Sequence, residues 1–99
     1  MLEWKSIHLE GKRFIGVYIA LPKQKIYIIY STKCILVGDV FDLHKMRSNI
    51  SVCTMRKADS FASLLQSECT ALNFAARNNG YTIGMKGKDI LLDKNKKKQ

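Results

Sequence analysis

The sequence predicts an α+β fold, in which an N-terminal antiparallel β meander is followed by mixed strands and helices. Three observations support this fold class. The first third of the chain is rich in Ile, Val, Tyr and Phe and is divided by very short breaks. A stretch in the second half carries apolar residues at helical spacing. The 99 residues are 46% hydrophobic, which suits one small domain with its own core.

Four strands are expected in the first third, over residues 4–9, 13–21, 25–30 and 33–37. The breaks between them are two or three residues long, which suits hairpins and therefore an antiparallel arrangement. Pro22 ends the second strand because proline donates no hydrogen bond to a neighbouring strand.

Both faces of the central strands are apolar. Within Phe14–Leu21 the two sets of alternate residues are apolar or aromatic apart from one glycine, and Ile26–Tyr30 shows the same pattern. An antiparallel sheet with one solvated face would instead alternate apolar and polar residues. The rest of the chain offers one long helix and two short ones as cover, so a second copy of the chain is expected on the other face. We therefore predict a homo-oligomer assembled through residues 4–37.

The clearest helix signal covers residues 60–79. Its stripe of apolar residues is expected to pack on the sheet as one long helix, and it consists of Phe61, Leu64, Leu65, Cys69, Leu72 and Ala76. Asp59 or Ser60 is a suitable residue to begin this helix, and Gly80 is a suitable residue to end it.

Shorter elements are expected around this helix. Gly38 ends the fourth strand, and Asp39 is expected to cap a short helix over residues 39–46. Residues 51–56 and 81–83 are predicted strands. Residues 87–92 are predicted to form a final helical turn.

The predicted domain covers residues 1–93, and residues 94–99 form a Lys-rich tail that is expected to be disordered. The whole chain has a net charge of +9. Such a charge is compatible with nonspecific nucleic-acid binding, but no helix-turn-helix, aromatic RNA-binding strand or concentrated basic face supports that function. The sequence contains neither a secretion signal nor an apolar run that could span a membrane, so a cytoplasmic location and no membrane partner are expected.

The cysteines predict buried thiols. The chain has an odd number of cysteines, three, which are widely spaced and surrounded by apolar or small residues: Cys34, Cys53 and Cys69. No C-x-x-C pair is present, and neither histidine lies near a cysteine at zinc-finger spacing. We therefore predict no metal site and no cofactor.

No residue pattern in the sequence identifies a catalytic site. His44 could act as a base oriented by Asp39 or Asp42, but all three lie in or beside one short predicted helix. No G-x-S-x-G motif is present. The sequence therefore leaves open whether the protein is an enzyme, and an active site between subunits stays an alternative.

One candidate site has a physical rationale, namely the turn that leads into the predicted long helix. Backbone N–H groups at a helix start attract anions, and two basic side chains lie beside them. The alternative is that Asp59 caps these groups and pairs with Arg56. The candidate anion site consists of Arg56, Lys57, Ser60 and Phe61, bordered by Gly38 and Asp39 at the end of a neighbouring strand.

These segments together resemble the YunC-like family of bacterial and archaeal proteins, a domain of unknown function of the DUF1805 type. The similar segments are Leu9-Glu10-Gly11, Leu21-Pro22-Lys23, Val37-Gly38-Asp39-Val40-Phe41-Asp42, Arg56 at a strand end, Ser60–Leu65, Ala75-Ala76 and Gly84-Met85-Lys86-Gly87-Lys88 before Leu91. The resemblance covers residues 7–92 and departs from the family in a shorter helix after Asp39. It implies an α+β fold that forms tetramers through its N-terminal β region, and it implies no activity or cofactor.

The function expected from the sequence is that of an oligomeric interaction module or a module that binds a small anionic ligand. Nucleic-acid binding through the basic surface and tail is the alternative from a second class. An enzyme with a site between subunits is the alternative from a third class.

Overall fold

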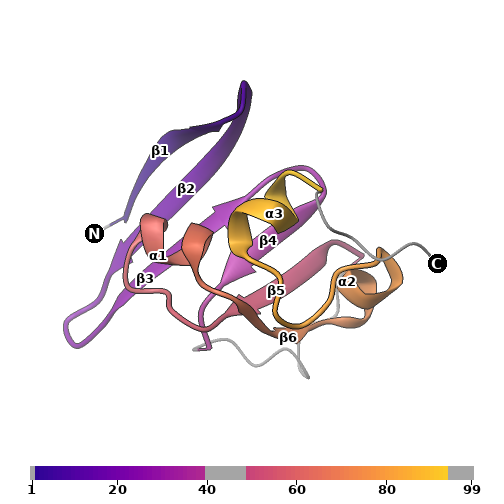
Figure 1. Ribbon diagram of the computed structural model, residues 1–99. Coiled ribbons are helices and arrows are strands. Elements are labelled where there is room, and N and C mark those ends of the chain that lie inside the picture. Colours follow the sequence, from indigo (N-terminus) through magenta and orange to yellow (C-terminus); the bar gives the residue numbers. More distant parts are fainter. Residues whose placement is uncertain (1, 40–48, 94–99) are drawn as a thin grey trace.

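The computed structural model describes residues 2–39 and 49–93. These residues form six strands and three short helices (Figure 1). The elements are β1 (Leu2–Leu9), β2 (Lys12–Ala20), β3 (Lys25–Tyr30), β4 (Cys34–Val37), β5 (Ser51–Met55), α1 (Phe61–Gln66), β6 (Cys69–Leu72), α2 (Phe74–Asn78) and α3 (Gly87–Leu91).

All six strands form one mixed sheet, and their order in the sheet is the order β1 to β6 along the chain. Neighbouring strands are antiparallel except β4 and β5, which are parallel. The turn between β1 and β2 contains only Glu10 and Gly11, and both have positive φ angles, of 48° and 80°. Two such residues produce the twist that a tight hairpin needs.

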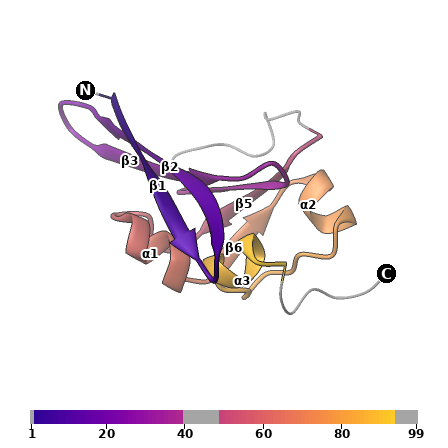
Figure 2. The same cartoon turned by 90° about the horizontal axis from the view of Figure 1, so that it is seen from above.

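The register of the strands gives the sheet two distinct faces. One face, here called the helix face, is covered by α1 and α3, which lie on the same side of the sheet (Figure 2). It carries Ile7, Phe14, Ile29, Leu36 and Cys53, all of which are buried.

The opposite face of β1–β3 is here called the open face. Cross-strand pairs such as Trp4 with Val17 and Val17 with Ile28 place these side chains on the same side of the sheet. Its apolar residues are Leu2, Trp4, Ile15, Val17, Ile19, Ile26, Ile28 and Tyr30, and each is at least partly exposed. Ser6, His8 and Arg13 add a polar end to this face.

Helices α1 and α3 pack against each other as well as against the sheet. A Cβ atom built on Gly87 would lie 1.9 Å from the carbonyl oxygen of Leu64, so this contact requires glycine. The ring of Phe61 lies over Gly16 in the same way, because a Cβ atom there would lie 2.8 Å from the ring. The small residues therefore determine how closely the helices approach each other and the sheet.

The predicted long helix over residues 60–79 is wrong. The structure divides this segment into α1, β6 and α2, and none of the three described helices exceeds six residues. Ser67 ends α1, and Asn73 begins α2 by accepting a hydrogen bond from the N–H of Ala76 at 2.9 Å. The fold class that rested on a long helix packed on the sheet is corrected to a six-stranded mixed sheet with short helices.

A change of register in β6 explains this error. Cys53 is opposite Leu72, but Met55 is opposite Cys69, because the register shifts between Thr54 and Met55. Such a bulge places two residues that are three positions apart on the same face of a strand. Cys69 and Leu72 are therefore both buried, at a spacing that is also typical of a helix face.

The remaining sequence-based expectations concern a strand over residues 81–83, a helix over 39–46 and the tail 94–99. The predicted strand over residues 81–83 is wrong, because these residues have no strand conformation and the isolated bridge in this region joins Glu68 to Lys86 instead. The short helix predicted over 39–46 and the tail 94–99 lie outside the described residues. Across the described ranges, no helix has the length and apolar character needed to cross a membrane.

Candidate functional site

The candidate site lies at the end of the sheet where β2 continues past the end of β3. The last pair between these strands joins Ile15 to Tyr30, whereas Lys12, Arg13 and Phe14 continue and pair with β1. The chain meanwhile turns from β3 into β4 through residues 31–33. A space is therefore left between the start of β2 and this turn.

The turn between β3 and β4 is held by Ser31. Its backbone N–H donates to the carbonyl oxygen of Cys34 at 2.9 Å. Its hydroxyl oxygen accepts hydrogen bonds from the backbone N–H groups of Lys33 and Cys34, both at 3.2 Å. A serine that bonds its own turn in this way restricts the backbone, so Lys33 leaves the turn in a defined direction.

Asp93 closes the space from the side of α3. Its carboxylate accepts hydrogen bonds from the hydroxyl of Tyr81 at 2.6 Å and from Nζ of Lys33 at 3.3 Å. Burial, followed by this hydrogen bond to Asp93, raises the pKa of Tyr81 well above its ordinary value of 10.0. Tyr81 therefore remains a neutral donor at physiological pH and holds Asp93 in place.

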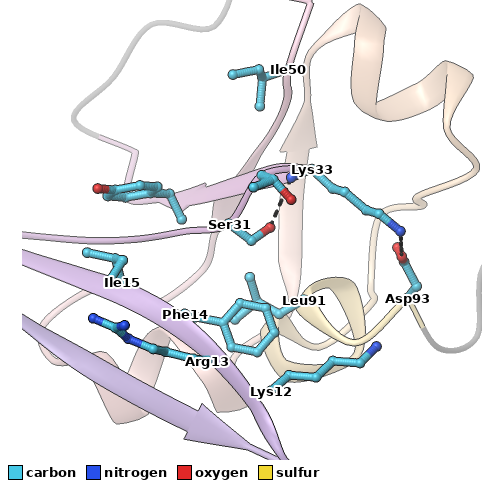
Figure 3. A pocket seen from close by; sticks show the side chains of 11 residues that line it. Lys12, Arg13, Phe14, Ile15, Ser31, Lys33, Ile50, Leu91 and Asp93 are labelled. Atoms are coloured by element: carbon cyan, nitrogen blue, oxygen red, sulfur yellow. Dashed lines mark hydrogen bonds and ion pairs between the residues drawn. The ribbon is translucent and has the colours of Figure 1, made fainter.

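The space between these elements is an open cavity of about 520 Å³, here called the basic pocket (Figure 3). Its floor contains the buried side chains of Phe14 and Leu91. Its charged lining comes from Lys12, Arg13, Lys33 and Asp93. The described residues that line it therefore include three cations and one carboxylate, which already accepts hydrogen bonds from Lys33 and Tyr81.

A second hollow of about 360 Å³ adjoins the basic pocket on the open face, and it is here called the apolar groove. Its lining is apolar or aromatic except for one arginine, and consists of Leu2, Trp4, Arg13, Ile15, Val17 and Tyr30. Nε of Arg13 donates to the hydroxyl of Ser6 at 2.9 Å, which fixes the guanidinium at the junction of the two hollows.

The three cysteines lie in the core and form no disulfide, as the sequence indicates. A hydrogen bond from the Cys53 thiol to Cys69, followed by burial, raises the pKa of Cys53, and the same hydrogen bond lowers the pKa of Cys69. Both side chains are at most 1% exposed, which keeps them from a substrate in solution. No set of three or more His, Cys, Asp or Glu residues able to hold a metal ion occurs within residues 2–39 and 49–93.

The anion site predicted from the sequence lies away from the basic pocket. Arg56, Lys57 and Asp39 are exposed, and a Cβ atom on Gly38 would lie 2.7 Å from Cβ of Ala58. The end of β4 and the turn before α1 are therefore close together, as that hypothesis requires.

At the start of α1 the chain supplies its own acceptor. The hydroxyl of Ser60 accepts the N–H of Ser63 at 3.0 Å. The ring of Phe61 points to the sheet, where it meets Tyr27 edge-on at 5.1 Å between ring centres. Binding of an anion at this turn stays a prediction, and His44 lies outside the described residues.

Sequence reasoning missed the residues of the basic pocket, although a signal was present. In an antiparallel meander the first and third turns lie at the same end of the sheet. Lys12 is the last residue of the first predicted turn, Arg13 follows it and Lys33 follows the third turn, so the predicted strands alone place these three cations at one end of the sheet. The contribution of Asp93 carried no comparable signal, since it depends on how α3 packs.

Comparison with known proteins gives the fold and no activity. A crystal structure of TA1206, a protein of unknown function from Thermoplasma acidophilum, superimposes with a TM-score of 0.81 at 14% sequence identity. The match covers 94% of this chain and 92% of that one. No protein-family model matches the chain. A search of curated proteins found no match either.

Proposed function

We propose that this protein is a binding module that takes a small anionic ligand in the basic pocket. The observation that carries the proposal is the lining of the cavity, which holds the three cations Lys12, Arg13 and Lys33 and the single carboxylate of Asp93. The net charge of +9 supports it, because a basic protein attracts anions to its surface. The cavity size falls in the range of about 300–1,000 Å³ that small-molecule sites usually occupy.

The three cations have different expected roles. Arg13 can offer two parallel N–H groups to a carboxylate or phosphate, whereas the lysines act as point charges. Asp93 is expected to orient Lys33 through their contact of 3.3 Å. The buried floor of Phe14 and Leu91 favours a ligand whose anionic group is attached to an apolar body.

The test is an NMR titration of the full chain with acetate and with phosphate, which follows the backbone amides around the pocket. We expect Arg13→Gln to weaken binding about tenfold, because a hydrogen bond between charged groups is lost. Lys23→Gln removes the same charge from the exposed turn between β2 and β3, outside both candidate sites, and serves as the matched control.

A second variant separates this site from the one predicted from sequence. If Arg56→Met abolishes binding and Arg13→Gln does not, the anion binds at the turn before α1 and the assignment to the basic pocket is wrong. If the ions raise the melting temperature of every variant equally, the effect is general exclusion of ions from the surface, and neither site exists.

A specific observation favours a second function, which is self-association through the open face. Leu2 and Trp4 are 68% and 66% exposed, and they lie beside half-buried residues of β2 and β3. Monomeric proteins seldom leave a continuous apolar face of this kind in water. Two copies of this chain could cover it by stacking their sheets face to face. Such stacking would also cover the apolar groove, so this second function is an alternative to ligand binding in that groove.

The test of self-association is one charged residue on the open face. Ile19 and Ile28 both lie there, so Ile19→Asp or Ile28→Asp should separate the subunits without unfolding them. Light scattering should change from a multiple of 11.3 kDa to the single-chain mass. A parent protein that is monomeric at micromolar concentration contradicts the proposal.

We also propose that the chain is a member of the YunC-like family and that it assembles as a tetramer. Both proposals are supported by the sequence resemblance over residues 7–92 and by the apolar open face. The proposed location is the cytoplasm, in keeping with three cysteines that form no disulfide.

A further inference from the structure

We infer that the ligand is a free single-chain amphiphile, with an anionic head in the basic pocket and an alkyl tail in the apolar groove. This inference rests on the proposed function and names the class of molecule that the site takes. A medium-chain carboxylate is the simplest representative.

The two hollows share part of their lining. Arg13, Ile15 and Tyr30 contribute to both, so the hollows are adjacent and one elongated ligand could contact both. Within this shared lining Arg13 supplies the charge and Ile15 supplies apolar contact. The junction is thus suited to the point where a polar head joins an alkyl chain.

The two hollows also differ from each other in polarity. The charged residues Lys12, Lys33 and Asp93 line only the basic pocket. Leu2, Trp4 and Val17 line only the apolar groove. A ligand with one charged end and one apolar end matches this order, whereas inorganic phosphate would leave the groove empty and a neutral alkane would leave the cations unused.

The sign of the charge selects an anionic head. Lys12, Arg13 and Lys33 outnumber Asp93, whose carboxylate already accepts hydrogen bonds from two donors. The basic pocket extends past the end of β3 to Lys12 and Phe14, whose register places them on the helix face. A flat bilayer surface on the open face would not reach these residues, which favours a free amphiphile.

Trp4 provides a direct readout, because it is the single tryptophan of the chain and lines the groove. The experiment titrates the full chain with decanoate below its micelle concentration and follows the tryptophan emission. We expect a blue shift and a higher intensity, since the tail would cover an indole that is 66% exposed. Acetate and decyltrimethylammonium are the reference ligands, and neither should shift the emission.

Two variants test the tail contact. Val17→Ser places a smaller and more polar side chain in the groove and should lower the affinity for decanoate about tenfold. The affinity for acetate should stay unchanged. Ile26→Ser makes a comparable change on the open face outside the groove and should have no effect on either ligand. Circular dichroism should show that both variants fold like the parent.

The outcomes separate this inference from the proposed function. If acetate binds in the basic pocket but decanoate binds no more tightly and leaves the emission unchanged, the amphiphile is excluded and the anion site stands. If neither ligand binds, both proposals fail. If decanoate has no effect but vesicles of an anionic phospholipid shift the emission, the open face contacts a membrane surface and the inference is overturned.

Discussion

The two halves of the sheet have similar apolar strands but very different surroundings. Every residue of β5 is buried, and β4 has three buried residues out of four. In β1–β3, by contrast, burial is confined to the helix face, and the open face remains at least partly exposed. An apolar pattern therefore shows that burial of a face is energetically favourable. It does not show whether the same chain provides the cover.

The largest expected effect comes from a change at the most tightly packed contact in the covered half. Gly87→Ala should lower the free energy of unfolding by about 3 kcal/mol or more, because its Cβ would lie 1.9 Å from the Leu64 carbonyl oxygen. Urea denaturation measures the loss. Gly84→Ala is the control, because nothing lies within 4 Å of its added Cβ. Only the backbone strain at its positive φ of 95° should lower the free energy of unfolding, by about 1 kcal/mol. Equal losses would mean that α1 and α3 do not pack closely.

The next effect compares the two faces at adjacent positions of one strand. Ile29→Ala should lower the free energy of unfolding by about 3 kcal/mol, because Ile29 is fully buried on the helix face. Ile28→Ala, on the open face, should cost about 1 kcal/mol when measured on dilute single chains. A loss at Ile28 as large as at Ile29 would show that the open face is covered within one chain.

The smallest effect concerns Tyr81, which joins the covered half to the basic pocket through Asp93. Tyr81→Phe should cost about 1 kcal/mol at neutral pH, since one hydrogen bond is lost. Folding raises the pKa of Tyr81 above 10.0, so its contribution is complete below that pH and declines as the pH rises above it. The difference in unfolding free energy between parent and variant should therefore shrink above about pH 10. A difference that stays constant to higher pH contradicts the buried contact.

The strand positions in the first half could be predicted because their signals are local. Residues 4–9, 13–21, 25–30 and 33–37 correspond closely to β1–β4, and short turns with suitable residues separate them. The prediction for 51–56 similarly matches β5. Such elements depend on alternation and turn chemistry within a few residues.

The segment over residues 60–79 could not be assigned in the same way, because tertiary contacts decide it. Asn73 accepts hydrogen bonds from the N–H groups of Val52 and Ala76, both at 2.9 Å, and so ties β5 to the start of α2. Its amide donates to the carbonyl oxygen of Ile50 at 3.0 Å. These partners lie more than twenty positions away in two cases, so helical spacing alone gave the wrong answer.

The candidate site could likewise be predicted from the sequence only in part. Lys12 lies in, and Arg13 and Lys33 directly follow, turns that a predicted meander places at one end of the sheet, so their proximity could be inferred from the sequence. The cavity between them was not, because it arises where β2 runs past β3 and where Leu91 and Asp93 close the side. Cavities depend on where elements end relative to one another, which a periodic pattern does not specify.

The order of the strands also has a consequence for how the chain is made. Since the sheet adds β1 to β6 in sequence, a strand leaving the ribosome finds the preceding strand already exposed beside it. The β1–β2 hairpin closes over a turn of only Glu10 and Gly11, so it can form early and at low entropic cost. The contact of Gly87 with α1 comes almost last, so the core is complete only when the final helix has been synthesised.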